Sequence, residues 1–351
     1  MEKQYIIPIF IPNTDNQDSY MFGYKDNITR DKAKKIIDNH LKNLDKENAK
    51  IEIDFLGGNF ISINKDIQNE LLETAYTYIK NGLVESIRIS TTPTDINKST
   101  LKRLKKYKVK TIELIVHSSN DYILQKSNMN YNFNDVKKAC KLIKWNGFKL
   151  CLQMVVGLPE STRIDEINTA KALIKLKPKI VKIYPILVIK NTKLEKDYND
   201  EKYEPLPLVQ AIEICKELVR MFYDRHIEIM SVGAENIFEP DNIVAGPYHP
   251  AFRQLVESSM WYDAIVGKIK KLNIKVKEVE VTVNPIDSNN VIGFNKENAI
   301  KLKDIYDVDL ILKQDEKMKQ GKSKIEITKT YHDFLEESEN NVNKKEPLKR
   351  S

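Results

Sequence analysis

Residues Lys149–Val156 read KLCLQMVV, and they are followed by Gly157, by the segment Thr162–Leu176 and by the segment Ile180–Ile186. The first and last segments are short apolar runs typical of buried strands, whereas Thr162–Leu176 has the apolar spacing of a helix. A strand, a helix and a second strand in this order predict a right-handed βαβ unit with parallel strands.

The same alternation continues on both sides of this unit. The other segments with strand character are Tyr5–Pro12, Lys50–Phe55, Ser86–Ser90, Thr111–His117 and a shorter run, Ile227–Ser231. The other segments with helix character are Thr29–Leu44, Lys65–Lys80, Lys98–Lys106, Asn134–Asn146 and Leu208–Arg225. At least six such units predict an α/β fold, a partial (β/α)6 barrel of the TIM type. An open doubly wound sheet is the alternative, although no GxGxxG motif follows the first strand.

The composition excludes several classes of protein. The chain has 351 residues, 41% of them hydrophobic, which suffices for a large core and excludes wholesale disorder. Three cysteines exclude a disulfide scaffold, and no apolar run reaches the roughly 20 residues of a membrane span. Because no signal-peptide pattern begins the sequence, we expect a cytoplasmic protein without membrane contact. The formal net charge of +7 permits a polyanionic partner without requiring one.

The sequence pattern changes after Gly267. Residues 1–267 are predicted to form the barrel. Residues 268–335, which include the alternating segment Asn273–Val283, are predicted to form a small α+β module. Residues 336–351 are charged, rich in Asn and poor in apolar side chains, which predicts a disordered tail.

Alternation along the strands predicts which side chains face the interior of the barrel. If the apolar sides of the strands pack against the helices, the opposite sides line the lumen. That lumen would hold Glu52, Asp54, Arg88, Glu113, Gln153, Lys182 and Tyr184. Buried charges must be paired or hydrated, so the pattern favours a bound polar ligand. The alternative is an open barrel whose inner face meets water. Arg88 and Glu113 are candidate lumen partners, either as an ion pair or as substrate contacts.

Several motifs occur in a fixed order between Tyr5 and Ser258. They are Ile9–Pro12 (IFIP), Phe55–Phe60 (FLGGNF), Arg88–Pro93 (RISTTP), Thr111–Leu114 with Ser118, Leu152–Pro159 (LQMVVGLP), Ile183–Thr192 and Ala245–Arg253 (AGPYHPAFR). Taken together, these motifs resemble the radical S-adenosylmethionine (SAM) superfamily. The branch they resemble is related to the catalytic subunit of Elongator and is called oxygen-independent coproporphyrinogen oxidase-like. The resemblance implies a partial (β/α)6 barrel of the radical SAM type, here with the small C-terminal α+β extension.

The sequence departs from this family in the loop after the first strand. The family pattern there is Cys-x3-Cys-x2-Cys, and its three thiolates hold a [4Fe–4S] cluster. Counted from Pro12, the three positions fall on Asn16, Tyr20 and Gly23, none of which can supply a thiolate. The cysteines of the chain are dispersed instead, at Cys140, Cys151 and Cys215. We therefore expect no [4Fe–4S] cluster and no required cofactor.

The resemblance also implies positions that contact SAM. Gly57, Gly58 and Asn59 match the turn that meets its amino group. Ser90 and Thr91 match residues near the ribose and carboxylate, and Gln153, Gly157 and Leu187 match residues near the nucleoside. Without a cluster SAM would lose its chelation to iron, so weak binding and no binding are the two alternatives. In the second alternative these residues serve only turns and packing. The dispersed histidines give no metal site, and His117 is expected to be a hydrogen-bonded polar residue.

These observations predict a radical SAM-like protein without cluster ligands. Its function would be that of a non-catalytic regulator or partner of a cluster-bearing paralogue, or of a binder of RNA or a nucleotide-like ligand. One alternative is a radical SAM enzyme, similar to tRNA-modifying ones, whose cluster ligands are unusual (Asp15, Asp18 and Tyr20) or come from a partner. Another is cluster-independent SAM-dependent chemistry. The basic run Lys102–Lys110 would meet phosphates or form a solvated helix face, and its single aromatic residue, Tyr107, gives little support to base stacking.

Overall fold

The computed structural model describes residues 3–12, 28–44, 49–234, 240–272 and 274–336. Contacts between residues divide the chain into two compact units, one up to Pro250 and the other from Ala251 onward. Helix α9 (Phe252–Lys270) belongs to the second unit, because Ile265 and Ile269 are buried in its core. The domain boundary that the sequence placed at Gly267 stays a prediction about independent folding. Of the tail predicted for residues 336–351, only Glu336 is described, and residues 337–351 lie outside the described residues.

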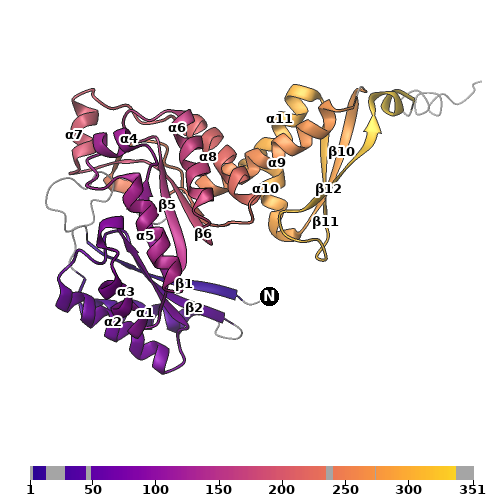
Figure 1. Ribbon diagram of the computed structural model, residues 1–351. Helices are drawn as coiled ribbons and strands as arrows, with labels where there is room; N and C mark the ends of the chain where they lie inside the picture. The colour runs from indigo at the N-terminus through magenta and orange to yellow at the C-terminus, as the bar shows by residue number, and fades with distance from the viewer. Residues whose placement is uncertain (1–2, 13–27, 45–48, 235–239, 273, 337–351) are drawn as a thin grey trace, which may run out of the picture. The chain divides into compact units, whose positions relative to one another are not determined.

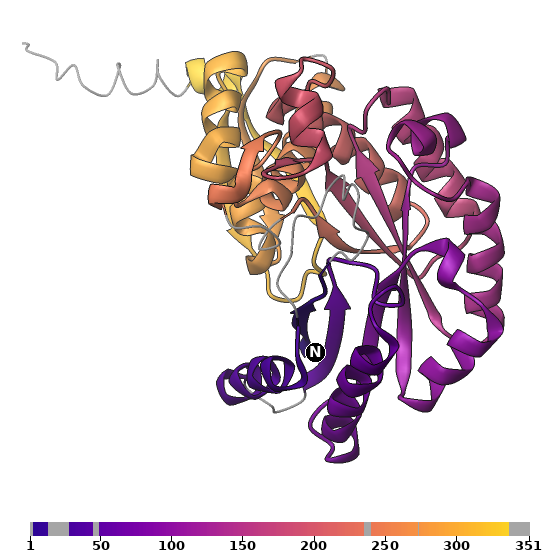
Figure 2. The ribbon, with the colours of Figure 1, turned by 90° about the vertical axis from the view of Figure 1, so that its left-hand side faces the viewer.

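The first unit contains a parallel sheet of seven strands. The strands are β1 (Lys3–Phe10), β2 (Ala49–Leu56), β3 (Ser86–Thr91), β4 (Val109–His117), β5 (Lys149–Val156), β6 (Ile180–Pro185) and β8 (Glu228–Val232). Their order in the sheet is the order of the chain, β1-β2-β3-β4-β5-β6-β8. A doubly wound sheet would reverse this order at a switch point, so the structure excludes that alternative. The strands curl into a partial barrel with helices on the outside (Figures 1 and 2).

Helices connect successive strands of this sheet. They are α1 (Arg30–Asn43), α2 (Lys65–Lys80), α3 (Lys98–Lys106), α4 (Asp121–Lys126), α5 (Phe133–Trp145), α6 (Arg163–Lys175), α7 (Lys193–Asn199) and α8 (Leu208–Tyr223). Local sequence fixes their ends. The Thr162 side chain accepts from the Asp165 amide and the Asp165 side chain accepts from Thr162, a capping box that begins α6. Gly147, at φ +80°, follows α5, and this left-handed backbone conformation at the end of a helix favours glycine.

A small antiparallel ribbon closes the first unit beyond β6. It pairs β7 (Val188–Ile189) with β9 (Ile243–Ala245). Gly246 follows β9, and a Cβ there would lie 3.2 Å from the Leu187 Cα. The AGPYHPAFR motif thus begins at a close backbone contact with the segment after β6, where only glycine fits without a shift.

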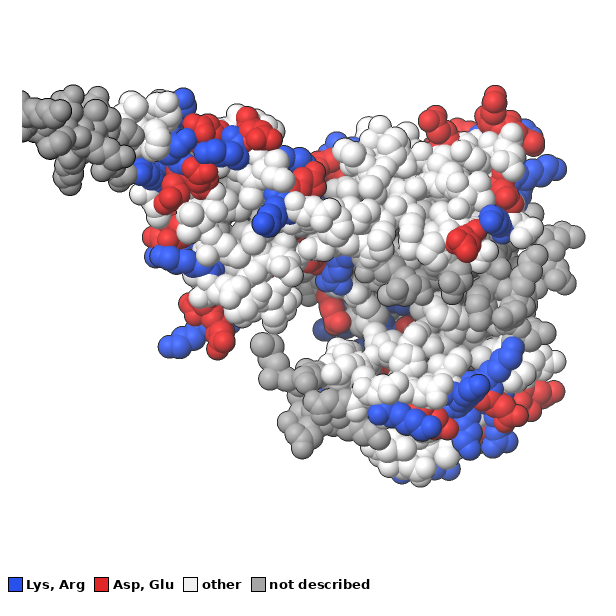
Figure 3. Space-filling view, turned by 180° about the vertical axis from the view of Figure 1, so that it is seen from behind, with Lys and Arg blue, Asp and Glu red and all other residues white. Residues whose placement is uncertain are grey.

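The second unit is an α+β module. Its sheet has the order β11-β10-β12, with strands β10 (Val276–Val283), β11 (Asp309–Gln314) and β12 (Ser323–Thr330). Its helices after α9 are α10 (Ser288–Ile292) and α11 (Glu297–Tyr306). Val279, Val281 and Val283 are fully buried on one face of β10, as the sequence alternation predicted. Acidic and basic side chains alternate over the surface of this unit (Figure 3).

Candidate functional site

The candidate site is the inner face of the curled sheet. Strand register places Asp54 beside Arg88, Ser90 beside Glu113, and Gln153 beside Lys182. All of these side chains are buried. The polar side of each strand therefore faces the lumen, as the alternation predicted.

Two cations neutralise most of the carboxylates in the lumen. The Arg88 Nη2 lies 2.6 Å from the Glu52 Oε2, and its Nε lies 3.0 Å from the same oxygen. The Glu52 Oε1 accepts from the hydroxyls of Ser86 and Thr111. Arg88 and Glu113, for which an ion pair was one of the two predicted roles, pair with other residues instead. The register between β3 and β4 sets Arg88 beside Thr111 and places Glu113 beside Ser90.

Lys182 forms the second ion pair. Its ammonium contacts Glu113, and the Lys182 Nζ also lies 3.5 Å from the Asp54 Oδ2. Burial acts to lower the pKa of Lys182, but the adjacent carboxylates, Glu113 first, hold that pKa above its ordinary value. Burial also raises the pKa of Glu113, against the attraction of Lys182. Three carboxylates face two cations, so the lumen has one negative charge in excess when all five groups are ionised.

Four buried polar atoms on the lumen face have no hydrogen-bond partner among the described residues, and one of them, the Glu113 Oε2, is in the ion pair with Lys182. The other three are the Asp54 Oδ1, the Ser90 Oγ and the Gln153 Nε2. Each side chain is at most 3% exposed. Buried polar groups are nearly always satisfied, so these atoms indicate that a polar ligand or ordered water completes the site.

The turn after β2 is held by its own side chains. The Asn59 amide donates to the Asp95 Oδ2 at 2.6 Å, and its carbonyl accepts from the Thr91 hydroxyl at 2.8 Å. A Cβ on Gly58 would lie 2.7 Å from the Ile11 carbonyl oxygen, which explains why glycine is needed there. The side chains of Asn59 and Thr91 therefore shape the turn. Asp95 completes this network from outside the quoted motifs, and no sequence pattern predicted its role.

The Gly157 backbone has hydrogen-bond partners, and Leu187 is buried. The Gly157 N–H donates to the Glu166 Oε1 at 2.9 Å, and the Gly157 carbonyl accepts from the Tyr203 hydroxyl at 2.8 Å. Leu187 is 4% exposed. Of the eight predicted SAM contacts, Ser90 and Gln153 have unpartnered side-chain atoms, so they are the ones most open to a ligand. Contact of all eight with SAM stays a prediction.

His117 ends β4 as a satisfied polar residue. Its Nδ1 lies 2.6 Å from the Tyr131 hydroxyl, and the two rings are stacked. Burial lowers the pKa of His117 to about 4, so the imidazole is neutral at physiological pH. This arrangement agrees with the expectation that His117 is a hydrogen-bonded polar residue.

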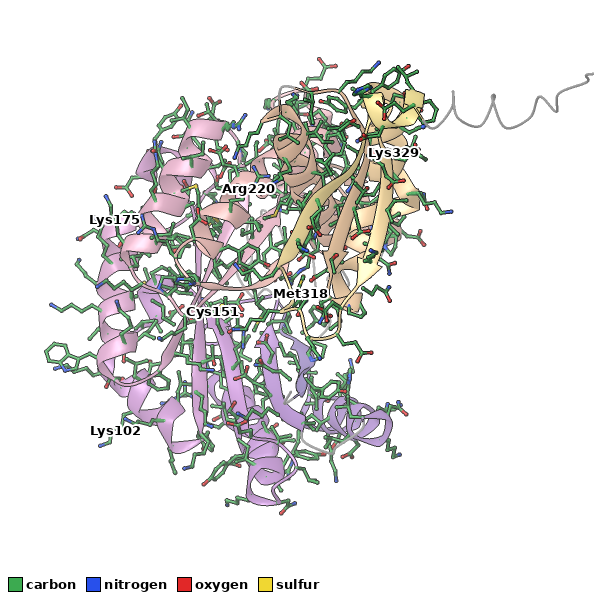
Figure 4. All side chains as sticks on the ribbon, turned by 90° about the vertical axis from the view of Figure 1, so that its right-hand side faces the viewer. Lys102, Cys151, Lys175, Arg220, Met318 and Lys329 are labelled. Carbon is green, nitrogen blue, oxygen red and sulfur yellow. The ribbon has the colours of Figure 1, made fainter. Side chains whose placement is uncertain are left out.

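The three cysteines lie apart on different elements. Cys140 is on α5 and Cys215 is on α8. Cys151 is on β5, in the sheet (Figure 4). All are buried free thiols. Burial raises the pKa of the Cys140 thiol to about 12 and raises the pKa of the other two as well. Within the described residues no group of three or more Cys, His, Asp or Glu side chains is arranged to hold a metal ion.

Comparison with known proteins shows the family. A model described as the radical SAM superfamily matches residues 21–173, and the radical SAM C-terminal domain model matches residues 178–262. The chain belongs to the radical SAM superfamily. The two matched ranges contain β2 to β6 and most of the lumen face described above.

Individual relatives place the chain near archaeal Elongator-like proteins. It is 29% identical over 168 residues to the uncharacterized protein MJ0486 of Methanocaldococcus jannaschii, covering 48% of this chain and 46% of that protein. It is 30% identical over 129 residues to a tRNA uridine(34) acetyltransferase of the same organism, covering 36% of this chain and 24% of that enzyme. The chain thus spans less than half the length of these two relatives.

A solved structure supports the barrel assignment. The archaeal Elp3 of Methanocaldococcus infernus, with an N-terminal deletion, has a TM-score of 0.61 and 19% sequence identity, covering 75% of this chain and 64% of that one. This likeness confirms the partial barrel of the radical SAM type. Among the described residues, no helix is both long enough and apolar enough to cross a lipid bilayer.

Family membership corrects the expectation about cofactors. The prediction that the chain requires no cofactor is wrong, because the radical SAM superfamily points to both a [4Fe–4S] cluster and SAM. The prediction relied on Asn16, Tyr20 and Gly23, which lie outside the described residues. The composition of one loop does not by itself decide which cofactors a member of the family uses.

The described residues fit SAM but do not fit an iron–sulfur cluster. The unpartnered atoms of Ser90, Gln153 and Asp54 fit a polar, cationic molecule such as SAM. The buried thiols of the chain do not fit a cluster, because cluster ligands are thiolates that converge on one point. No chemical step is therefore derived through a cluster.

Proposed function

We propose that this chain is a SAM-binding subunit that acts as a regulator or partner of a cluster-bearing paralogue. The observation that carries the proposal is the set of three unpartnered polar atoms beside a surplus carboxylate in the lumen. SAM carries a sulfonium and an ammonium group, so the surplus negative charge favours it over a neutral nucleoside.

The positions of the cysteines favour a second protein as the source of the cluster ligands. Iron–sulfur clusters are held by converging cysteines, and those of this chain are buried on three separate elements. The proposal therefore assigns the cluster ligands to groups other than these cysteines, which a paralogue can supply. A complete radical SAM enzyme assembled from both chains is the alternative form of the same proposal.

Two observations support proposals about the partner of this chain and its cellular compartment. The relatives named tRNA uridine(34) acetyltransferase act on tRNA, so RNA is a second candidate partner for this chain. The three free cysteines accord with a reducing compartment, and we propose the cytoplasm.

Calorimetric titration of the full chain with SAM and with S-adenosylhomocysteine tests the proposal. The two ligands differ in the sulfonium charge, so we expect SAM to bind several-fold more tightly. Asp54→Asn removes the carboxylate in excess of the two cations and should narrow this preference, since the remaining charges balance. Equal affinity for the two ligands, or no heat at millimolar SAM, would overturn the proposal.

Serine variants provide a matched control. The hydroxyls of Ser90 and Ser127 are both buried without a partner among the described residues, but only Ser90 faces the lumen. We expect Ser90→Ala to weaken SAM binding by about 2- to 10-fold and Ser127→Ala to leave it unchanged. Equal effects from the two variants would show that SAM does not contact the lumen.

A further inference from the structure

A basic surface lies on the outer side of the barrel, away from the lumen. Three stretches of the sequence, residues 96–112, 136–159 and 167–194, contain no Asp or Glu but many Lys residues. They include the C-terminal halves of α3, α5 and α6. Parallel strands place the C-terminal ends of the connecting helices at one end of the sheet, so these halves are neighbours.

Two contacts join the three helix ends. The Lys105 Nζ donates to the Asn146 carbonyl at 3.3 Å, which links α3 to the end of α5. The Lys144 Nζ donates to the Leu176 carbonyl at 2.8 Å, which links α5 to the end of α6. Lys102 of α3 and Lys175 of α6 both extend outward along the same edge of the first unit (Figure 4).

A groove of about 350 Å³ lies between α5 and α6. The residues that line it are Lys137, Cys140, Lys141, Lys144, Trp145, Lys175 and Leu176. The lysines are exposed, and among the described residues none of them forms an ion pair with a carboxylate. We call this surface the α5–α6 basic groove.

The exposed side chain of Trp145 also favours a ligand at this groove, independently of the lysines. Its side chain is 79% exposed, the largest exposure among the large hydrophobic residues of the described chain. Lysines at helix C-termini offset the helix dipole, which accounts for Lys144 but not for an indole left in water. An exposed aromatic ring between cations has the chemistry that stacks on an unpaired base while phosphates meet the lysines.

We infer that the α5–α6 basic groove binds single-stranded nucleic acid, with phosphates on Lys141 and Lys175 and an unpaired base stacked on Trp145. The surface is separate from the lumen, so this inference does not depend on SAM binding. Trp145 supplies the stacking group that the basic run Lys102–Lys110 lacks, since Tyr107 is only 9% exposed.

Fluorescence anisotropy with labelled oligonucleotides tests the inference. The probes are an unmodified tRNA, a single-stranded RNA of about ten nucleotides and a single-stranded DNA of the same sequence. We expect Lys141→Glu/Lys175→Glu to lose at least about 10-fold in affinity and to reduce the salt dependence, because fewer counterions are released. Lys319→Glu/Lys322→Glu, on exposed lysines of the second unit, is the matched control and should lose less than about 3-fold.

Variants of Trp145 separate stacking from charge. Trp145→Ala should lose about 5- to 100-fold for single strands, whereas Trp145→Phe keeps most of the affinity. Bound RNA should quench wild-type tryptophan fluorescence more than that of Trp145→Phe. Binding of both the tRNA and the DNA strand would show that the groove recognises features common to single strands. Binding of the RNA probes alone would identify RNA as the partner.

Three outcomes would overturn the inference. One is an equal loss of affinity in the groove variant and the control variant. Another is unchanged binding by Trp145→Ala. The third is binding of poly-glutamate as tight as that of the oligonucleotides, which would identify the groove as a site for acidic proteins instead.

Discussion

At the residue scale, Gly58 holds the turn of the candidate site against β1. A Cβ there would lie 2.7 Å from the Ile11 carbonyl oxygen and 2.8 Å from that of Pro12. Both are backbone atoms, so Gly58→Ala must move the chain, and we expect a loss of about 1–3 kcal/mol in unfolding free energy. Urea denaturation measures the loss. In contrast, Gly267→Ala meets no atom within 4 Å inside α9 and should be neutral or stabilising. A neutral Gly58→Ala would contradict this account of the turn.

The hydrogen bond between His117 and Tyr131 gives a second residue-scale prediction. Tyr131→Phe leaves the buried His117 Nδ1 without its partner at 2.6 Å, so we expect a loss of about 1–3 kcal/mol in stability. Tyr122→Phe, on an exposed ring in α4, serves as the control and should change stability little. Equal stability of the two variants would indicate that this buried bond contributes nothing.

Side-chain alternation made the lumen residues predictable, but not their partners. Which strand face is polar follows from Glu52, Asp54 and Arg88 alone, because neighbouring side chains in a strand point to opposite faces. The pairing of Arg88 with Glu52 depends on the register between β2 and β3, which one sequence does not reveal. Trp145 was likewise unpredictable as an exposed residue, because an apolar side chain at the end of a helix usually packs inward.

At the element scale, Glu166 couples α6 to the end of β5. Its Oε1 accepts from the Gly157 N–H and from the Ser161 hydroxyl at 2.6 Å. Burial raises the pKa of Glu166 to about 7, from an ordinary value of 4.5. The folded chain therefore holds a proton on Glu166 between these two pH values, where the unfolded chain has lost it. This contribution to stability is complete below pH 4.5 and declines as the pH rises through 7.

Glu166→Gln should remove this decline, because the amide oxygen can still accept both hydrogen bonds. Between about pH 5 and pH 8, the stability of the variant relative to wild type should rise by up to about 3 kcal/mol. Thermal unfolding across this pH range measures the change. Glu217→Gln, on the neighbouring α8 and paired with Arg163 at the surface, is the control and should stay parallel to wild type. A parallel curve for Glu166→Gln would show that the carboxyl is ionised in the folded state.

At the scale of the whole molecule, the positions of the three cysteines decide whether they can hold iron. We expect Cys140→Ala, Cys151→Ala and Cys215→Ala to leave the iron and sulfide content of anaerobically purified protein unchanged from wild type. The reason is that the three thiols lie on separate elements and are protonated, since burial raises the pKa of each. A loss of iron in any of the three variants would make that cysteine a ligand.

The order of the strands explains how much of the architecture the sequence could show. Each βα unit carries its own periodicity, so the barrel was predictable from the local pattern of Lys149–Val156 and its repeats. The division of the chain at Pro250 was not, because the Phe252–Lys270 helix shows where it packs only through contacts with later elements. The family match extends over the same βα units and confirms the barrel independently.

The most direct test of the central claim is an experimental structure of the chain with SAM bound. The account predicts SAM in the lumen, with the Gln153 Nε2 and the Ser90 Oγ within hydrogen-bond distance of the ligand and Asp54 facing its positive charge. SAM bound elsewhere on the chain, with only water at these three side chains, would contradict it.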